Sequence, residues 1–383
     1  MKEIKVTFKT ITPLWTGDAW GECKEIKPSA IMGSLRFWFE TIMYFRGILK
    51  KKDFNSKSGR FEKEVDRKKL KDFVQKYGND KMEIIKYLIN KQHIPISSVI
   101  FGATNWRSLI EIKKIEFDEN RFQDEPKRKI IPNKKWYFGS PSYQGKFEVI
   151  FKVKEEILNS IFYPLLTFMD KYGFWGGKWN IGYGRLKIES IEENNIVKNS
   201  WQKSDFELFG DICFSWENLI NQMQLDNNAS EYEILKMVLK VENFYCNTER
   251  KFEQKISNIP KKIVFINNLL SDNNFEDLIK GLLVKKARIR NCLRYECEEI
   301  FQKECFKDKK FQKDKKIKCN QKEIECKECK KEIMKWKNFR HKLLGERREG
   351  SKVLPFIFEE NNQLKSGFLS VAGLLNLEGE NNA

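Results

Sequence analysis

The order in which hydrophobic periodicities change along the first half of the chain limits its fold more than any other feature. Residues 2–10 alternate polar and apolar side chains, with Ile4, Val6 and Phe8 on one face, which predicts a half-buried strand. Residues 28–49 follow the 3.6-residue period of an amphipathic helix. Further strands and a second long helix are expected near residues 108–117, 135–139, 146–153 and 155–172. Strands and helices that interleave in this way predict an α+β unit.

The pattern starts again near residue 205, and two landmarks indicate an internal duplication. Gly102 is followed six residues later by Ser108, and Gly345 is followed at the same distance by Ser351. A length of 383 residues also fits two domains of ~100–200 residues better than one. We therefore predict two tandem ferredoxin-like (RRM-like) domains with insertions, 1–197 with a glycine-rich loop and 198–383 with a Lys/Cys-rich insertion at about 297–335.

The charge of the chain points to a polyanionic partner. Lys and Arg outnumber Asp and Glu by 72 to 54, which gives a formal charge of +18. Nucleic acid is the leading partner for such an excess, although a Lys-rich proteome or a thermophilic source would also raise the count. Residues 50–71 hold many of these cations and are expected to form an exposed, solvated or RNA-facing insertion.

Cysteine number and hydropathy indicate a cytoplasmic protein without a membrane anchor. Nine Cys, an odd number, lie scattered in a chain whose first ten residues resemble a strand and not a signal peptide. No apolar run approaches the ~18 residues that span a bilayer. The cysteines are therefore expected to be reduced thiols or metal ligands.

The segment from Gly173 to Arg185 is the sharpest local signal. Its glycines permit positive φ and close backbone approach, so that successive N–H groups can point at one anion. Aromatic and basic residues lie between the glycines and suit base stacking and phosphate contact. The residues expected to bind RNA here are Gly176, Gly177, Lys178, Trp179, Gly182, Gly184 and Arg185. The competing interpretation is a tight helix-to-strand crossing whose aromatics fill the core.

A second candidate site lies at the start of the helix that follows the first strand. Lys27 and Ser29 flank a helix N-terminus, Gly33 keeps the surface low, and Arg36 follows one turn later. Such an N-terminus favours a phosphate. The alternative is a Ser N-cap with Arg36 in a surface ion pair. In the second half, Arg290 and Arg294 are the corresponding basic residues of a predicted helix.

These motifs resemble a known family. The Pro-Ser-x-x-x-Gly-x-x-Arg helix of residues 28–36 and the glycine-rich loop before a terminal strand look like the RAMP superfamily of CRISPR effector subunits. Together with residues 11–18 and Phe101-Gly102, they are similar to the first RAMP subunit of type III-B (Cmr) complexes. The resemblance covers residues 1–190 well and the second half only weakly.

The resemblance implies a non-catalytic RNA-binding subunit. Guide (CRISPR) RNA, target RNA and other RAMP subunits of the effector complex are the implied partners. It implies no catalysis, because target cleavage in such complexes belongs to the backbone subunit. The enzymatic alternative is a metal-dependent endoribonuclease that uses Asp18, although a lone Asp beside Gly is more often a turn residue.

A cysteine cluster in the Lys-rich stretch predicts a structural zinc site. Cys326 and Cys329 have the two-residue spacing of a zinc knuckle, and Cys319 lies seven positions earlier. The fourth ligand is expected to be Cys305, with Cys297 as the alternative. Unliganded, reduced thiols remain the competing interpretation, because a second Cys-x-x-Cys pair is missing.

Overall fold

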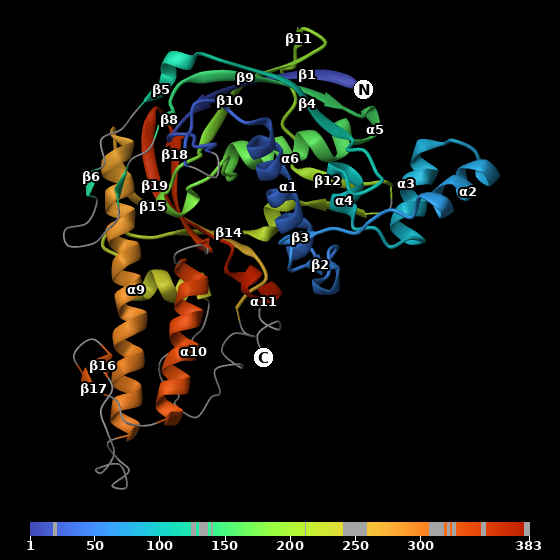
Figure 1. The fold of residues 1–383 in the computed structure, drawn as a ribbon. Helices are drawn as coiled ribbons and strands as arrows, with labels where there is room; N and C mark the ends of the chain where they lie inside the picture. Colours follow the sequence, from blue (N-terminus) through green and yellow to red (C-terminus); the bar gives the residue numbers. More distant parts are fainter. Residues whose placement is uncertain are drawn as a thin grey trace. The chain divides into compact units, whose positions relative to one another are not determined.

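The computed structural model divides the chain into two compact units, residues 1–221 with 356–364 and residues 222–355 with 365–383 (Figure 1). It describes residues 1–17, 21–123, 128–129, 137–138, 141–210, 212–239, 259–305, 318–319, 322–323, 327–345 and 350–378. The chain is α+β, as predicted, and carries several sheets. None of the helices in these ranges is long and apolar enough to span a membrane.

The N-terminal unit is built on a five-stranded sheet with β1 at its centre. The strand order is β11-β10-β1-β9-β4, and every pair whose register is known is antiparallel. The strands are β1 (Lys2–Thr10), β4 (Ile110–Phe117), β9 (Lys146–Val153), β10 (Leu186–Glu193) and β11 (Ile196–Val197). Ile4, Val6 and Phe8 are fully buried, which confirms the predicted inward face of β1.

Two helical segments lie on the same side of this sheet (Figure 1). They are α1 (Pro28–Phe45) and the run of α5 (Glu155–Ile157), a π-helical turn η3 (Leu158–Phe162) and α6 (Tyr163–Lys171). The predicted apolar stripe of α1 is buried throughout. The helix ends at Phe45, earlier than expected, because Gly47 takes a positive φ of 81° and the chain turns there.

An insertion of small elements separates α1 from β4. It contains a 3₁₀ turn η1 (Lys51–Asp53), a hairpin of β2 (Phe54–Asn55) and β3 (Arg60–Phe61), and the helices α2 (Arg67–Tyr77), α3 (Lys81–Asn90) and α4 (Ile96–Phe101). Asp66 and Asp80 cap α2 and α3 through the backbone N–H groups of Lys69 and Glu83. No residue of α2 is buried, whereas α4 is buried along most of its length.

Several short strands and 3₁₀ turns connect the larger elements of this unit. Between β4 and β9, β5 (Phe122–Gln123) pairs with β8 (Ser142–Tyr143), and β6 (Arg128–Lys129) pairs with β7 (Tyr137–Phe138). The 3₁₀ turns are η2 (Glu119–Arg121), η4 (Trp179–Ile181) and η5 (Trp216–Leu219).

Near residue 205, where the sequence pattern starts again, the chain forms a hairpin of β12 (Asp205–Leu208) and β13 (Ile212–Ser215). Phe209 and Gly210 both take positive φ, 53° and 82°, which turns the chain back on itself. The hairpin follows the predicted domain boundary after residue 197 and packs in the N-terminal unit. Its Phe206 ring lies 6.1 Å from that of Phe39 on α1.

The C-terminal half contains a four-stranded sheet, a short strand pair and several helices. The sheet order is β14-β15-β19-β18, and β16 pairs with β17. The strands are β14 (Ile220–Gln224), β15 (Ile263–Asp272), β16 (Lys318–Cys319), β17 (Lys322–Glu323), β18 (Val353–Glu360) and β19 (Gln363–Ser370). The helices are α7 (Glu231–Leu239), α9 (Phe275–Cys305), α10 (Lys327–Leu344), η7 (Ala372–Leu374) and α11 (Leu375–Glu378), with α9 and α10 side by side (Figure 1).

The two predicted landmarks of the duplication have the same hydrogen-bond pattern. The Oγ of Ser108 lies 2.5 Å from the carbonyl oxygen of Ile110 and accepts the N–H of that residue at 3.2 Å. The Oγ of Ser351 lies 2.6 Å from the carbonyl oxygen of Val353 and accepts its N–H at 3.1 Å. Each hydroxyl also reaches a carbonyl oxygen of the preceding helix end, that of Ile100 or Leu343.

The glycines of the two landmarks match as well. Gly102 has a φ of 89° and Gly345 a φ of 78°. An arginine from the long helix of each unit donates to these carbonyls, Arg36 to Gly102 and Arg290 to Gly345. The same arrangement in two units supports a duplication beyond the two sequence landmarks.

We expect Ser108→Ala and Ser351→Ala to loosen their own units locally. Each change leaves a backbone N–H without its side-chain acceptor, a loss of about 1 kcal/mol. Hydrogen exchange measured by mass spectrometry should accelerate roughly fivefold in residues 100–117 for the first variant and 343–360 for the second. Ser58→Ala, at an exposed turn, is the control and should change neither segment. Unchanged exchange in both would show that the motif carries no stability.

Candidate functional site

Three segments of the N-terminal unit meet at the glycine-rich loop. The N–H of Gly177 donates to the carbonyl oxygen of Trp15 at 2.7 Å, and that of Gly184 donates to Pro13 at 2.8 Å. The N–H of Gly176 donates to the Oγ of Ser34 on α1 at 2.9 Å. The loop at residues 11–17, the first half of α1 and residues 173–185 therefore form one surface.

The glycines of this loop are required by close backbone approach. A Cβ at Gly176 would lie 2.3 Å from the carbonyl oxygen of Trp15, and one at Gly184 would lie 2.1 Å from that of Trp175. Both residues also have positive φ, 68° and 88°. A Cβ at Gly177 would meet the Trp15 ring at 2.6 Å. A side chain at Gly176 or Gly177 would push the loop away from residues 11–17, and one at Gly184 would distort the loop itself at Trp175.

The predicted cradle of N–H groups around one anion is not what this loop forms. The N–H groups of Gly176, Gly177 and Gly184 bond to acceptors of the protein, as described above, and Gly182 donates to the carbonyl oxygen of Trp179 at 2.9 Å. Because each N–H group already has an acceptor, the loop glycines shape the surface and do not bind a phosphate through their amides.

Lys178 and Trp179 are half-buried residues of the loop with large side chains. The Lys178 ammonium lies 4.7 Å from the centroid of the Trp15 ring, in a cation–π contact, and burial lowers the pKa of this lysine. Lys178 is also held at a positive φ of 60°. The Trp179 ring packs beside Phe37 at 5.1 Å, and its N–H donates to the carbonyl oxygen of Trp175.

Arg185 lies inside the unit and does not reach a phosphate. Its side chain is 1% exposed, and its guanidinium donates to the carbonyl oxygens of Ile357 at 3.1 Å and Lys171 at 2.9 Å, among others. The guanidinium carbon lies 4.2 Å from the Phe356 ring centroid. Burial lowers the pKa of Arg185 to about 9, with the Asp170 carboxylate acting in the opposite direction. The predicted RNA contact of Arg185 is therefore replaced by internal packing.

Arg36 is likewise internal, in contrast to the phosphate contact expected from the sequence. It is 9% exposed, and its Nε donates to Oε1 of Glu40 at 2.8 Å. Its two other nitrogens donate to the carbonyl oxygens of Gly102 and Phe61, from the insertion that covers this face of α1. Burial raises the pKa of Glu40, and the hydrogen bond from Arg36 opposes that shift.

Lys27, Ser29 and Gly33, the other residues predicted at this helix start, lie at or near the N-terminus of α1. Lys27, not Ser29, is the N-cap of α1, and no side chain caps this helix start. Pro28 occupies the first turn, which contains no acidic residue. Ser29 is exposed, and nothing lies within 4 Å of the place where a Cβ on Gly33 would be. This helix start is open and electrostatically suited to an anion.

The predicted residues of the second half have a mixed outcome. Arg290 donates to the carbonyl oxygens of Leu344 at 2.7 Å and Gly345 at 2.6 Å, which repeats the internal role of Arg36. Arg294 lies on α9, but its side chain lies outside the described residues. The same holds for Asp18 and for the cysteine side chains of the predicted zinc site, Cys297, Cys305, Cys319, Cys326 and Cys329. Where side chains are described, no cluster of three potential metal ligands occurs.

Trp15 is a site residue that the sequence prediction left out. Its ring lies against Gly17 and Gly177, where a Cβ would come within 2.2 and 2.6 Å of ring atoms, and it carries Lys178 on its face. The signal for it is the pair of glycines that leave space for a large ring, one on each loop.

We expect Arg36→Ala to destabilise the N-terminal unit by about 3–5 kcal/mol, because the buried Glu40 would lose its counter-charge. Urea unfolding followed by tryptophan fluorescence measures the loss. Lys57→Ala, at an exposed turn of the same insertion, is the control and should stay within about 0.5 kcal/mol of wild type. Equal stability of the two variants would show that Arg36 is a surface residue that does not stabilise the unit.

Comparison with known proteins gives one family match and several distant structural likenesses. Residues 7–187 match the family model described as RAMP superfamily. The crystal structure of Cmr1 from Pyrococcus furiosus is 12% identical, with a TM-score of 0.34, over 97% of this chain and 88% of that chain. No curated protein matches the sequence.

Two further likenesses are to cryo-EM structures of the type III-B Cmr-beta complex bound to cognate target RNA. One, which also contains AMPPnP and was determined in the presence of single-stranded DNA, is 11% identical with a TM-score of 0.38 and covers 98% of both chains. The other is 12% identical with a TM-score of 0.36 and covers 96% of this chain and 94% of that chain. TM-scores in this range do not establish a shared fold.

Proposed function

We propose that this chain, whose residues 7–187 match the RAMP superfamily, is a non-catalytic RNA-binding subunit of a type III-B (Cmr) CRISPR effector. Guide RNA, target RNA and the other RAMP subunits are its proposed partners. The family match includes the end of β1, the whole of α1 and the glycine-rich loop, and the motifs of residues 11–36 and 173–185 carry the resemblance to the first RAMP subunit of such complexes.

The observation that carries the proposal is the open N-terminus of α1 beside the glycine-rich loop. An RNA phosphate at this helix start would meet the positive end of the helix dipole and the nearby Lys27. Gly33 leaves space for the nucleic-acid backbone one turn further on. Contacts of this kind position RNA without reading its sequence, which fits a complex in which base pairing between guide and target supplies specificity.

The domain organisation proposed here is two tandem ferredoxin-like domains with insertions. In the N-terminal sheet, β10, β1, β9 and β4 have the order expected for a strand-helix-strand-strand-helix-strand unit. The repeated serine, glycine and arginine contacts support a second copy in the C-terminal half. The endoribonuclease alternative depends on Asp18, and no feature of the described residues favours it.

We expect the isolated chain to bind single-stranded RNA with strong salt dependence and little sequence preference. Contact with ~6 phosphates would give a slope of about −4 for log affinity against log salt concentration. Gly33→Ala should weaken binding by about tenfold, because its methyl group enters the open surface. The same change should stabilise the helix by about 0.5–1 kcal/mol.

Fluorescence anisotropy with a labelled oligoribonucleotide measures the affinity, and thermal unfolding measures the stability. Gln75→Ala, on the exposed helix α2, is the control for helix propensity and should leave RNA affinity unchanged. A wild-type chain without salt-dependent RNA affinity would contradict the proposed function. Undiminished affinity in Gly33→Ala would remove the α1 N-terminus from the site.

We also propose that Cys319, Cys326, Cys329 and either Cys305 or Cys297 hold one structural Zn²⁺. The support is their spacing in a Lys- and Glu-rich stretch that has few apolar residues of its own. Elemental analysis should find one equivalent of zinc in the purified chain. Chelation should raise protease sensitivity near residue 310 and leave residues 1–190 folded. Metal-free protein with equal protection near residue 310 would show that these cysteines are ordinary thiols.

A further inference from the structure

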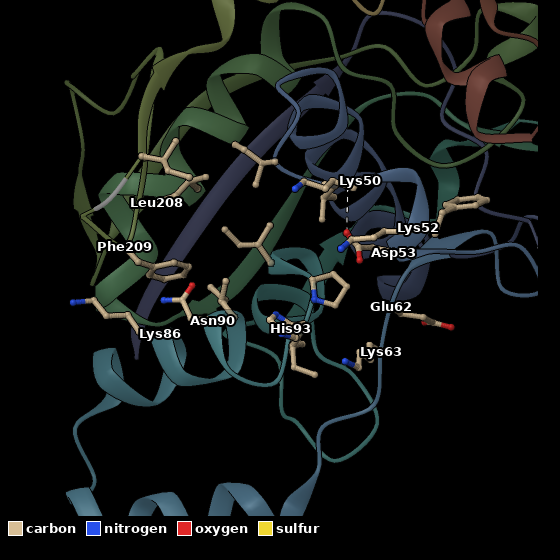
Figure 2. A pocket seen from close by; sticks show the side chains of 18 of the residues that line it. Lys50, Lys52, Asp53, Glu62, Lys63, Lys86, Asn90, His93, Leu208 and Phe209 are labelled. Atoms are coloured by element: carbon tan, nitrogen blue, oxygen red, sulfur yellow. Dashed lines mark hydrogen bonds between the residues drawn. The ribbon is translucent and has the colours of Figure 1, made fainter.

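A pocket of about 760 Å³ lies between the insertion and the β12–β13 hairpin, within the N-terminal unit (Figure 2). Its size falls in the range of pockets that enclose a small ligand, ~300–1,000 Å³. It is distinct from the glycine-rich loop, since none of its lining residues belongs to residues 11–17 or 173–185.

The pocket combines an apolar surface with a few polar groups. The apolar lining comes from the segment after α1, from α3, α4 and the loop between them, and from the β12–β13 hairpin, and includes Ile48, Leu49, Ile94, Pro95, Leu208 and Phe209. The polar residues Asn55 and Asn90 also line it. Such a lining suits a flat aromatic ligand that carries hydrogen-bonding groups on its edge.

Positive charge lies at both ends of this apolar surface. In Figure 2, Lys86 lies near Phe209 and Asn90, whereas Lys50, Lys52 and Lys63 lie on the opposite side. The lining therefore contains four lysines and only two acidic residues, Asp53 and Glu62, and its net charge is positive.

Two of these lysines form no ion pair with a carboxylate of the described residues. Within the described part of the chain, no carboxylate lies within 4.0 Å of the ammonium of Lys50 or Lys52. Lys63 donates to the carbonyl oxygen of Gln92 at 2.7 Å, and Lys86 pairs with Glu83 at 3.4 Å.

The backbone around the pocket is held in unusual conformations. His93 and Phe209 line it with positive φ, 54° and 53°. The other described non-glycine residues with positive φ are asparagines, which tolerate it, and Lys178 of the glycine-rich loop. Strained residues of this kind gather at binding sites, where the surrounding structure fixes them. Here Gln92 fixes the loop, because both ends of its amide bond to the backbone of Asp66.

We propose that this pocket binds one unstacked nucleotide of single-stranded RNA. The proposal rests on the RNA-binding function proposed above and adds a second contact point to it. A base on the apolar surface would be covered on one face, and Asn55 or Asn90 would meet its edge. A nucleotide within a strand has a phosphate on each side, which accounts for lysines at both ends of the pocket.

The same features disfavour other ligands. A duplex keeps its bases stacked inside, so it would present only phosphates and leave the apolar lining exposed. A free inorganic phosphate would use the lysines alone. An acidic peptide would meet the lysines but offers no flat ring for the apolar surface.

The test compares two double charge reversals in the full-length chain. Lys50→Glu with Lys52→Glu changes the pocket, and Lys57→Glu with Lys68→Glu makes the same charge change at exposed positions of the insertion outside it. The probe is a fluorescein-labelled 12-nucleotide oligouridylate. We expect the pocket variant to bind it at least about tenfold more weakly than the control variant, with a salt slope shallower by about 1.4, or 0.7 per lost phosphate contact.

Crosslinking locates the contact independently. The same oligonucleotide with 4-thiouridine, irradiated with the wild-type chain, should crosslink to peptides from residues 48–55 or 208–212. Thermal unfolding of both double variants confirms that they fold, as expected for exposed lysines. A 12-residue oligoglutamate serves as the peptide probe and should bind wild type more weakly than the RNA does.

Each other outcome contradicts one proposal and can be told apart from the rest. RNA binding by wild type with equal losses in the two double variants, or crosslinks only to residues 15–36 and 173–185, would overturn the pocket assignment and leave the proposed function intact. Oligoglutamate that binds as tightly as RNA, and is lost in the pocket variant, would make the pocket a peptide site. Failure of wild type to bind RNA would overturn the proposed function and the pocket assignment together.

Discussion

The surface around the α1 helix start depends on one backbone contact, the approach of the glycine-rich loop to residues 11–17. Gly177 and Gly184 donate to the carbonyl oxygens of Trp15 and Pro13, and Trp15 lies so close that no Cβ fits at Gly176 or Gly177. This contact places Lys178 over the Trp15 ring and connects the loop to Ser34 of α1. If the loop moved away from residues 11–17, the pair of Lys178 and Trp15 would no longer lie on the same surface as the start of α1. The glycines thus determine the shape of this surface.

The arginines that the sequence suggested for RNA contact instead form hydrogen bonds within the protein. Arg36, Arg185 and Arg290 each donate to backbone carbonyls, and a guanidinium is well suited to this role because it has five donors in a rigid plane. Lysines dominate the candidate RNA-contacting surfaces, at the α1 helix start, in the glycine-rich loop and around the pocket of the insertion. A flexible, hydrated ammonium suits contact with a phosphate backbone of variable conformation.

Several parts of the fold and site could be predicted from local pattern. The alternation in β1 and the apolar stripe of α1 describe faces that are in fact buried, because burial of apolar surface follows the period of the backbone. The hairpin at residues 205–215 was missed, since its turn depends on positive φ at Phe209, a residue type that gives no such signal. The polar face of α1 was taken as exposed because nothing local reveals that the insertion covers it.

By itself, the sequence determined the α+β class, the interleaved order of strands and helices, the positive charge and the two serine–glycine landmarks. All of these follow from periodicity, composition and spacing along the chain. Only the tertiary structure decided which cations are buried. Arg36 was expected at the surface, yet it is buried and donates to the carbonyl oxygens of Phe61 and Gly102 in the insertion. Burial of a charge depends on segments distant in sequence, because the partners that compensate its desolvation come from them.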